Sequence, residues 1–243
     1  MQDQINSTHL LPETAWNDET LPDGVPPEDR VVVTITRQFA SGGAEIGQLV
    51  SQKSQLHYID RDIIERVAGR LGVDTRHVER QDEQTAGMTG HIFESIQASN
   101  PFFVNYSTLF GQASSTTQMH EIAYLHLTQR VVLEAATDGD AVIVGRGSQF
   151  LLHNVPRTLH AYIFAPTPYR IENAMKQYNL DHARATRLIQ QRDYEHDSYL
   201  RKYYGSDGHQ PGLYHLLINT SLFSLELAAD LIVQSLDVIK QLT

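Results

Sequence analysis

A glycine-rich loop follows the first strongly apolar stretch of the chain. The segment VVVTI (31–35) has the β-branched composition of a buried strand, and TRQFASGG (36–43) comes directly after it. Glycines allow several backbone N–H groups to converge on one anion, and a helix that begins after the loop adds the positive end of its dipole. The pattern favours a phosphate-binding loop, with a tight strand-to-helix turn as the alternative.

This loop lacks both side chains on which the usual P-loop depends. Gly43 stands at the lysine position, and Ala44 replaces the hydroxyl residue that would hold Mg²⁺. Arg37 is the nearest cation, and it could reach the β- or γ-phosphate of a nucleotide if the loop turns back. The alternative for Arg37 is a salt bridge to Asp60 or Glu45. The sequence leaves both readings open.

A dinucleotide-binding loop is a rival interpretation of the same segment. Asp60 ends a second short strand, HYID (57–60), roughly where an acidic residue would hold a ribose. That fingerprint needs G-x-G-x-x-G directly after the strand, whereas five residues separate Thr36 from Gly42 here. The spacing therefore disfavours this interpretation.

Arginines gather further along the chain. Arg146 follows the buried strand AVIV (141–144), at the edge where parallel sheets bind ligands. A later segment (184–205) concentrates charged side chains: Arg184, Arg187, Arg192, Arg201 and Lys202, with Asp193 and Asp197. In a chain of net charge −10 this clustering indicates one of two things. It is either a solvated helix with i,i+4 ion pairs or a mobile lid that brings arginines to a phosphoryl group.

Composition excludes several classes of function. The 243 residues carry a net charge of −10, which disfavours binding to nucleic acid or to an anionic membrane. The chain has no cysteine, so it has neither disulfides nor thiolate metal sites. No stretch approaches the ~20 apolar residues of a membrane span. The 12 histidines show no metal-binding spacing, and we expect a cytoplasmic protein.

Strand and helix patterns alternate from residue 31 to the end of the chain. This alternation predicts an α/β fold, a mainly parallel sheet with helices on both faces. The remaining predicted strands are 158–165 and 212–221, and the predicted helices are 121–140, 181–203 and 224–242. Residues 81–119 are expected to form a mostly helical insertion. Residues 1–30 are acidic and proline-rich, and we expect a disordered or surface-draped arm.

Segments spread over the chain together resemble the cytidylate kinase-like family of P-loop nucleoside monophosphate kinases. They are VTITRQFASGGAEIG, HYIDRDII, AVIVGRGSQFLL, QQRDYEHDSYLRKYYG and LLINTS, and the resemblance covers about residues 31–241. It implies a P-loop NTPase-type five-stranded parallel sheet with helices on both faces. It also implies that 81–119 binds the monophosphate and that 181–205 is a lid. The implied reaction is phosphoryl transfer from ATP, with Mg²⁺, to a nucleoside monophosphate, CMP or dCMP favoured.

The resemblance also assigns roles by position in the family motifs. The ATP-binding residues would be Ser41, Gly42, Gly43, Ala44 and Arg187. The acceptor-binding residues would be Asp60, Arg61, Arg146 and Asp197, and the catalytic residues Arg37, Arg192 and Arg201. Arginines suit this chemistry because phosphoryl transfer mainly requires positioning and charge stabilisation. Ala44 departs from the family, which often has an arginine there, and the spacing to Asp197 is one residue longer than usual.

Two other functions fit the same residues. The loss of the lysine and hydroxyl side chains also suits a nucleotide-binding pseudokinase with a sensing or scaffolding role. A kinase of a different small acceptor fits too, because the composition of 81–119 does not specify a base. The expected partners are small-molecule nucleotides. Apolar positions on the C-terminal helix would support a homodimer, and they fit a core equally well.

Overall fold

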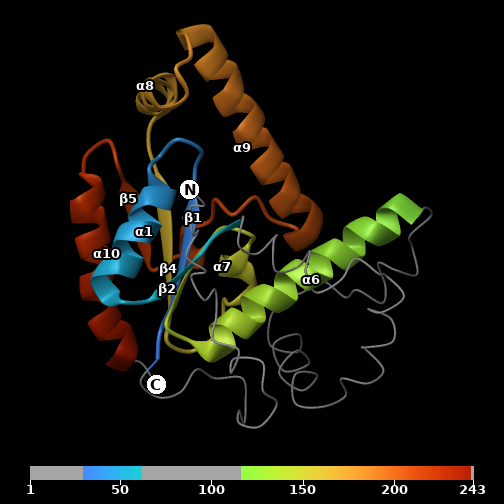
Figure 1. The fold of residues 1–243 in the computed structure, drawn as a ribbon, viewed down its shortest axis with the longest axis vertical. Coiled ribbons are helices and arrows are strands. Elements are labelled where there is room, and N and C mark those ends of the chain that lie inside the picture. The colour runs from blue at the N-terminus through green and yellow to red at the C-terminus, as the bar shows by residue number, and fades with distance from the viewer. Residues whose placement is uncertain (1–29, 62–115, 242–243) are drawn as a thin grey trace, which may run out of the picture.

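The computed structural model describes residues 30–61 and 116–241, which build a five-stranded parallel sheet with helices on both faces (Figure 1). The strands are β1 (Val32–Arg37), β2 (His57–Ile59), β3 (Ala141–Val144), β4 (Thr158–Phe164) and β5 (Leu216–Asn219). They lie in the order β2-β3-β1-β4-β5. The predicted α/β fold is therefore confirmed. The predicted arm, apart from Arg30, and the predicted insertion up to residue 115 lie outside the described residues.

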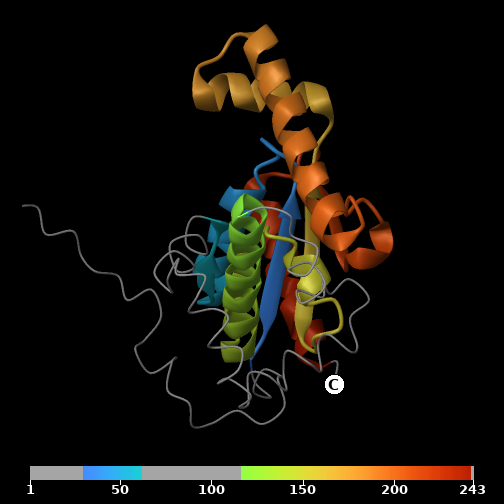
Figure 2. The same cartoon turned by 90° about the vertical axis from the view of Figure 1, so that its right-hand side faces the viewer.

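The helices divide between the two faces of the sheet. They are α1 (Gly43–Ser54), α6 (Thr116–Asp138), α7 (Ser148–Leu151), α8 (Thr167–Tyr178), α9 (His182–Tyr204) and α10 (Leu225–Gln241). Helices α1 and α10 cover one face, and α6 and α7 cover the other (Figure 1). Helices α8 and α9 project beyond the carboxyl edge of the sheet (Figure 2). No helix in the described ranges is long and apolar enough to cross a membrane.

Strand β1 is central because its side chains are apolar on both faces. Val33 and Ile35 pack in the core under α1 and α10, whereas Val32 packs in the core under α6 and α7. β1 pairs in parallel with β3 and with β4, from Val32 onward in both ladders. The strand is buried on both faces from Val32 to Thr36, Thr34 included, as the β-branched composition of this segment predicted. Its carboxyl end delivers Arg37 to the edge of the sheet.

Two element boundaries differ from the sequence prediction. The predicted strand over 212–221 is shorter: β5 covers Leu216–Asn219, and a 3-10 helix occupies Pro211–Leu213. Pro211 cannot donate to a strand ladder, and Leu213 packs in the core under α6 and α7 instead. Helix α6 begins at Thr116, so residues 116–119 of the predicted insertion belong to this helix.

A buried histidine on β4 makes stability sensitive to acid. The ring of His160 is 2% exposed, its Nδ1 lies 2.6 Å from Thr34 Oγ1, and it stacks on His215 with centroids 5.2 Å apart. Burial, together with the neighbouring His215 and His153, lowers the pKa of His160 from 6.5 to about 3. The folded protein therefore keeps this ring neutral at pH values where the unfolded chain protonates it.

We expect the free energy of unfolding to fall as the pH drops below about 6.5, because only the unfolded chain then binds this proton. The contribution of one such site is about 1.4 kcal/mol per pH unit. Urea unfolding at pH 7.5 and pH 5.5 checks this by comparing the native chain with a His160→Gln variant. The variant should lose less stability between the two pH values, and equal losses would contradict the expectation.

Candidate functional site

The loop after β1 turns its carbonyl groups toward the protein. Gln38 O accepts from the Ser41 N–H at 3.3 Å and from Ser41 Oγ at 2.8 Å. Ser41 O accepts from Thr220 Oγ1 at 2.8 Å, and Gly42 O accepts from the N–H of Ile46 at 3.0 Å. These bonds come from the loop itself, from the end of β5 and from α1, so they fix the loop on two sides.

Helix α8 holds the other two loop carbonyls. Phe39 O accepts from Arg170 Nη1 at 3.3 Å, and Ala40 O accepts from Asn173 Nδ2 at 3.2 Å. The N–H groups of residues 42–44, at the start of α1, have no acceptor within the described part of the chain. A helix N-terminus with such N–H groups is a site for an anion. The loop of residues 38–44, called the cradle below, therefore has a geometry suited to an anion such as phosphate.

Both glycines of the cradle are required by close neighbours. Gly42 has φ +84°, a left-handed conformation, and a Cβ there would lie 2.5 Å from Leu225 Cδ2. A Cβ on Gly43 would lie 2.4 Å from the Cβ of Arg37. Any side chain at position 43, a lysine included, is thus incompatible with the present position of the Cβ of Arg37 and would require α1 or β1 to shift.

Arg37 runs from the first turn of α1 to the turn after β3. Its Nη1 lies 2.5 Å from where a Cβ on Gly145 would stand, so only glycine leaves room for the guanidinium. Burial lowers the pKa of Arg37; Arg146 and Arg61 lower it further, while Tyr58 and Asp60 act in the opposite direction. The guanidinium therefore lies between the cradle and the ends of β2 and β3.

Three successive left-handed residues form the turn after β3. Gly145, Arg146 and Gly147 have φ values of +84°, +60° and +69°. The left-handed conformation costs a non-glycine residue about 1 kcal/mol, and such strain gathers at functional sites. Tyr204 Oη donates to Arg146 O at 3.1 Å and holds the turn. Burial lowers the pKa of the Arg146 guanidinium, and nearby Tyr199 opposes that shift.

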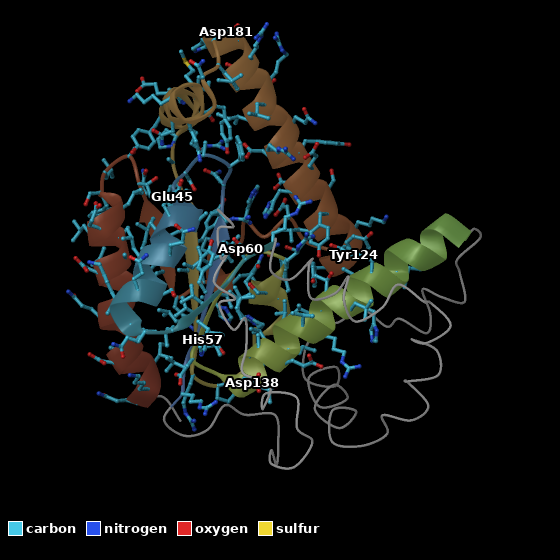
Figure 3. The ribbon with its side chains drawn as sticks, viewed as in Figure 1. Glu45, His57, Asp60, Tyr124, Asp138 and Asp181 are labelled. Atoms are coloured by element: carbon cyan, nitrogen blue, oxygen red, sulfur yellow. The ribbon has the colours of Figure 1, made fainter. Side chains whose placement is uncertain are left out.

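Three sequence-predicted arginines converge at this edge of the sheet. The pKa of Arg37 responds to both Arg61 and Arg146, and the pKa of Arg146 responds to Arg61. Asp60, at the end of β2, lies between α1 and α9 in the view of Figure 3. Guanidinium groups so close together repel one another, and an anion between them would offset this repulsion. The arrangement suits a phosphate group.

The predicted lid residues are not drawn into this cluster. Arg192 pairs with Glu195 at 3.1 Å and Arg201 pairs with Asp207 at 3.2 Å, all on the outer part of α9 and the segment that follows. The side chains of Arg192 and Arg201 are about half exposed, 47% and 55%. Arg187 is exposed on the same helix. As the structure stands, these three arginines face solvent.

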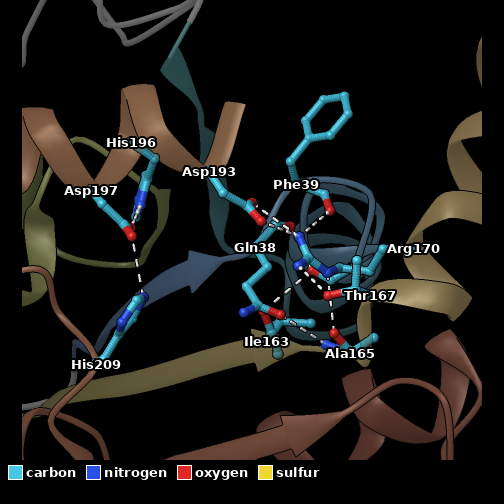
Figure 4. Close-up of polar contacts among 11 residues, drawn as sticks. Gln38, Phe39, Ile163, Ala165, Thr167, Arg170, Asp193, His196, Asp197 and His209 are labelled. Carbon is cyan, nitrogen blue, oxygen red and sulfur yellow. Dashed lines mark hydrogen bonds and ion pairs between the residues drawn. The ribbon is translucent and has the colours of Figure 1, made fainter. Parts of the chain in front are cut away.

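Asp197, predicted to bind the acceptor, contacts two histidines instead. Its Oδ1 lies 3.5 Å from His196 Nδ1 and 3.6 Å from His209 Nε2 (Figure 4). Burial lowers the pKa of His196, and the charge of Arg37 lowers it further. His196 therefore faces the arginine cluster from α9, although the sequence did not single it out.

Arg170 is the functional residue that sequence reasoning missed most clearly. It is 4% exposed, and its Nη1 lies 2.9 Å and 2.8 Å from the two carboxylate oxygens of Asp193 (Figure 4). The available signal was an arginine next to Ile171, inside the buried stripe that Ile171 and Ala174 form on α8. Its partner lies 23 residues further on, so no local pattern connects the two.

The described residues hold no ready-made cluster of metal-binding side chains. Among residues 30–61 and 116–241, no group of three histidine or carboxylate side chains could hold a metal ion. Ser41 Oγ already donates to Gln38 O and Ile163 O, and Ala44 has no hydroxyl. The Ser41 N–H also donates to Gln38 O, so in this structure Ser41 shapes the loop, whereas the N–H groups of residues 42–44 have no acceptor among the described residues.

Comparison with known proteins agrees with the geometry. A family model described as the cytidylate kinase-like family matches residues 32–222. No curated protein matches the chain. An uncharacterized protein from Eubacterium ventriosum has a similar fold, with a TM-score of 0.60, 16% identity, and coverage of 86% of this chain and 99% of that one. This similarity shows the fold alone.

Two shikimate kinases are more distantly similar. The enzyme from Acinetobacter baumannii, solved with shikimate, has a TM-score of 0.45 and 12% identity over 89% of this chain and 97% of its own. The enzyme from Bacteroides thetaiotaomicron has a TM-score of 0.43 and 12% identity over 88% and 99%.

Proposed function

Because the chain belongs to the cytidylate kinase-like family, we propose that it transfers the γ-phosphoryl group of ATP to a nucleoside monophosphate, with CMP or dCMP preferred. One observation carries the proposal. A single side chain, Arg37, touches both the anion cradle at Gly43 and the arginine-bearing turn at Gly145. The proposed donor and acceptor sites would thus adjoin one another, and a phosphoryl group would pass between them under one guanidinium.

On the donor side, the N–H groups of residues 42–44 would bind the β- and γ-phosphates of ATP. Arg37 lies at the exit of this cradle and remains protonated at neutral pH despite its lowered pKa. Its planar fork can contact two oxygens of the phosphoryl group as that group leaves ADP. Arg37 would therefore supply the charge that a P-loop lysine supplies elsewhere.

On the acceptor side, Arg61 and Arg146 would bind the phosphate of the monophosphate, with Asp60 orienting their guanidinium groups or the sugar. A phosphate oxygen of the acceptor attacks the γ-phosphorus, and the bond from that phosphorus to the β–γ bridging oxygen breaks. The products are ADP and a nucleoside diphosphate. The attacking oxygen is already anionic, so the reaction needs no general base.

Helix α9 would complete the site on closure. Arg192 and Arg201 would exchange their exposed partners, Glu195 and Asp207, for the transferred phosphoryl group, and Arg187 would reach ATP. Exposed ion pairs are weak, so this exchange costs little. Asp197 would act on the sugar or hold His209 in place. These roles require α9 to move relative to the cradle.

A second candidate is nucleotide binding without transfer. The specific observation behind it is Ala44, which lacks a metal-binding hydroxyl where the cradle begins α1. Such a pseudokinase would bind ATP and use the bound state as a signal or scaffold. A kinase that acts on another small acceptor is the remaining alternative.

The test is an ADP-release assay with ATP, Mg²⁺ and a panel of CMP, dCMP, UMP, AMP, GMP and dTMP. We expect turnover on CMP or dCMP. In an Arg146→Gln variant, KM for the acceptor should rise about tenfold to 100-fold, because a charged hydrogen bond is lost. KM for ATP should stay unchanged.

The other outcomes of this assay are equally informative. ATP binding by calorimetry without turnover on any acceptor would favour the pseudokinase. Turnover on an acceptor outside the panel would correct the substrate. Neither binding nor turnover would overturn the nucleotide reading of the loop altogether.

A further inference from the structure

We propose that Arg170 and Asp193 form a latch that couples the phosphate cradle to helix α9, so that nucleotide binding and the position of the lid depend on one another. Arg170 is a positioning residue in this proposal. The inference rests on the proposed function, because it assigns the coupling to the donor nucleotide. It is built from the contacts shown in Figure 4.

All three guanidinium nitrogens of Arg170 donate to protein groups. Nη1 donates to both oxygens of Asp193 and to Phe39 O, and Nε donates to Ala165 O at 3.1 Å. Nη2 lies 3.5 Å from Thr167 Oγ1. A side chain so fully engaged does not serve as a phosphate ligand. It instead joins the cradle, the end of β4 and the middle of α9 at one point.

The latch holds the peptide after Phe39, and the conformation of this part of the cradle sets the direction of the cradle's N–H groups. Phe39 O accepts from Arg170, so losing this bond frees the peptide between residues 39 and 40 to rotate. The ring of Phe39 stacks on Tyr178 of α8 with centroids 5.7 Å apart, and Ala40 packs on the apolar cluster between α8 and α9. In this structure the cradle therefore packs against the α8–α9 pair, so a movement of α9 must change these contacts.

The other end of α9 is fixed to the acceptor side. Leu200 and Tyr204 are buried in the core under α6 and α7, and Tyr204 Oη donates to Arg146 O. Helix α9 thus spans from the cradle, through Asp193, to the turn that carries Arg146. A change at the donor loop reaches the acceptor turn along one continuous helix.

The latch depends on the charges of both Arg170 and Asp193. Arg170 is buried, and its positive charge is neutralised by a carboxylate that is 31% exposed. Without Asp193 the buried cation has no compensating charge, and Arg170 no longer ties α9 to the loop. Gln38 separately joins the cradle to the end of β4, because its Oε1 accepts from the Ala165 N–H at 3.2 Å.

The test is hydrogen exchange with ADP and Mg²⁺ as the probe, followed by mass spectrometry of peptides from 38–46 and 182–200. In the native chain, ADP should slow exchange in both segments. In Asp193→Asn, ADP should slow exchange in 38–46 but not in 182–200, and ADP affinity should fall about tenfold. Asp193→Glu keeps the charge and should restore much of the lid response.

Two further variants separate coupling from simple stability. Arg170→Lys keeps the buried charge but cannot reach Asp193, Phe39 O and Ala165 O together, and it should reproduce the loss of lid response. Arg184→Gln removes an exposed ion pair with Asp181 on the same helix and should behave as the native chain. If Asp193→Asn and Arg170→Lys both show lid slowing on ADP binding, the latch is refuted. If ADP slows neither segment of the native chain, the proposed nucleotide binding itself fails.

Discussion

An Arg37→Met variant is expected to lose about 10³-fold in kcat, the lower end of what a transition-state arginine contributes. Methionine keeps the unbranched stem that packs between Gly43 and Gly145, so the change removes the charge while largely preserving the packing. The change also removes the repulsion between Arg37 and the nearby Arg61 and Arg146, so the thermal unfolding midpoint should not fall. Single-turnover kinetics with saturating ATP and acceptor measures the effect.

Two matched variants sharpen this result. Arg37→Lys keeps the charge but not the planar fork, and it should lie between the native chain and Arg37→Met. Arg184→Met, on the exposed face of α9, should have native kinetics. Native kcat in Arg37→Met would show that Arg37 has only a structural role. The positive charge that a P-loop lysine supplies would then have to come from the lid arginines.

Restoring the conventional lysine should inactivate the protein. In Gly43→Lys the new Cβ would lie 2.4 Å from the Cβ of Arg37, so α1 or β1 must shift. We expect ATP affinity to fall at least about 100-fold, since the N–H groups at the start of α1 move with the helix. Calorimetric titration with ATP measures this change, and thermal unfolding should show a lower midpoint.

A double variant distinguishes steric conflict from loss of glycine. Arg37→Gly with Gly43→Lys removes the conflicting side chain and places the cation on the helix. It should recover ATP binding relative to Gly43→Lys alone, and activity should recover in part. If Gly43→Lys alone binds ATP as the native chain does, the two positions are not exclusive, and the substitution needs another explanation.

The fold was predictable because its signals are local. The apolar run before the loop forms β1, and the alternation of elements produces the parallel sheet. The cradle and Arg146 were also predictable, since both follow buried strands and must lie at the carboxyl edge. The start of β5 was not predictable, because Leu213 is buried under α6 and α7 as part of a 3-10 helix, and the strand begins only at Leu216.

The site was predictable only in part. Sequence reasoning named Arg37, Asp60, Arg61 and Arg146, and the structure brings these four to one edge of the sheet. It could not choose a direction for the Arg37 side chain, because rotamers depend on what packs around them. It also placed Arg192 and Arg201 in the site, whereas both hold exposed ion pairs on α9.

The sequence by itself determined which elements form and which residues reach the ligand edge, since periodicity and strand ends are properties of neighbouring residues. Only the tertiary structure decided that position 43 lies too close to the Cβ of Arg37 for any side chain and that Arg170 joins the cradle to Asp193. Both depend on side chains that are distant in sequence or compete for one volume. Contacts of that kind are fixed by packing, and no local pattern contains them.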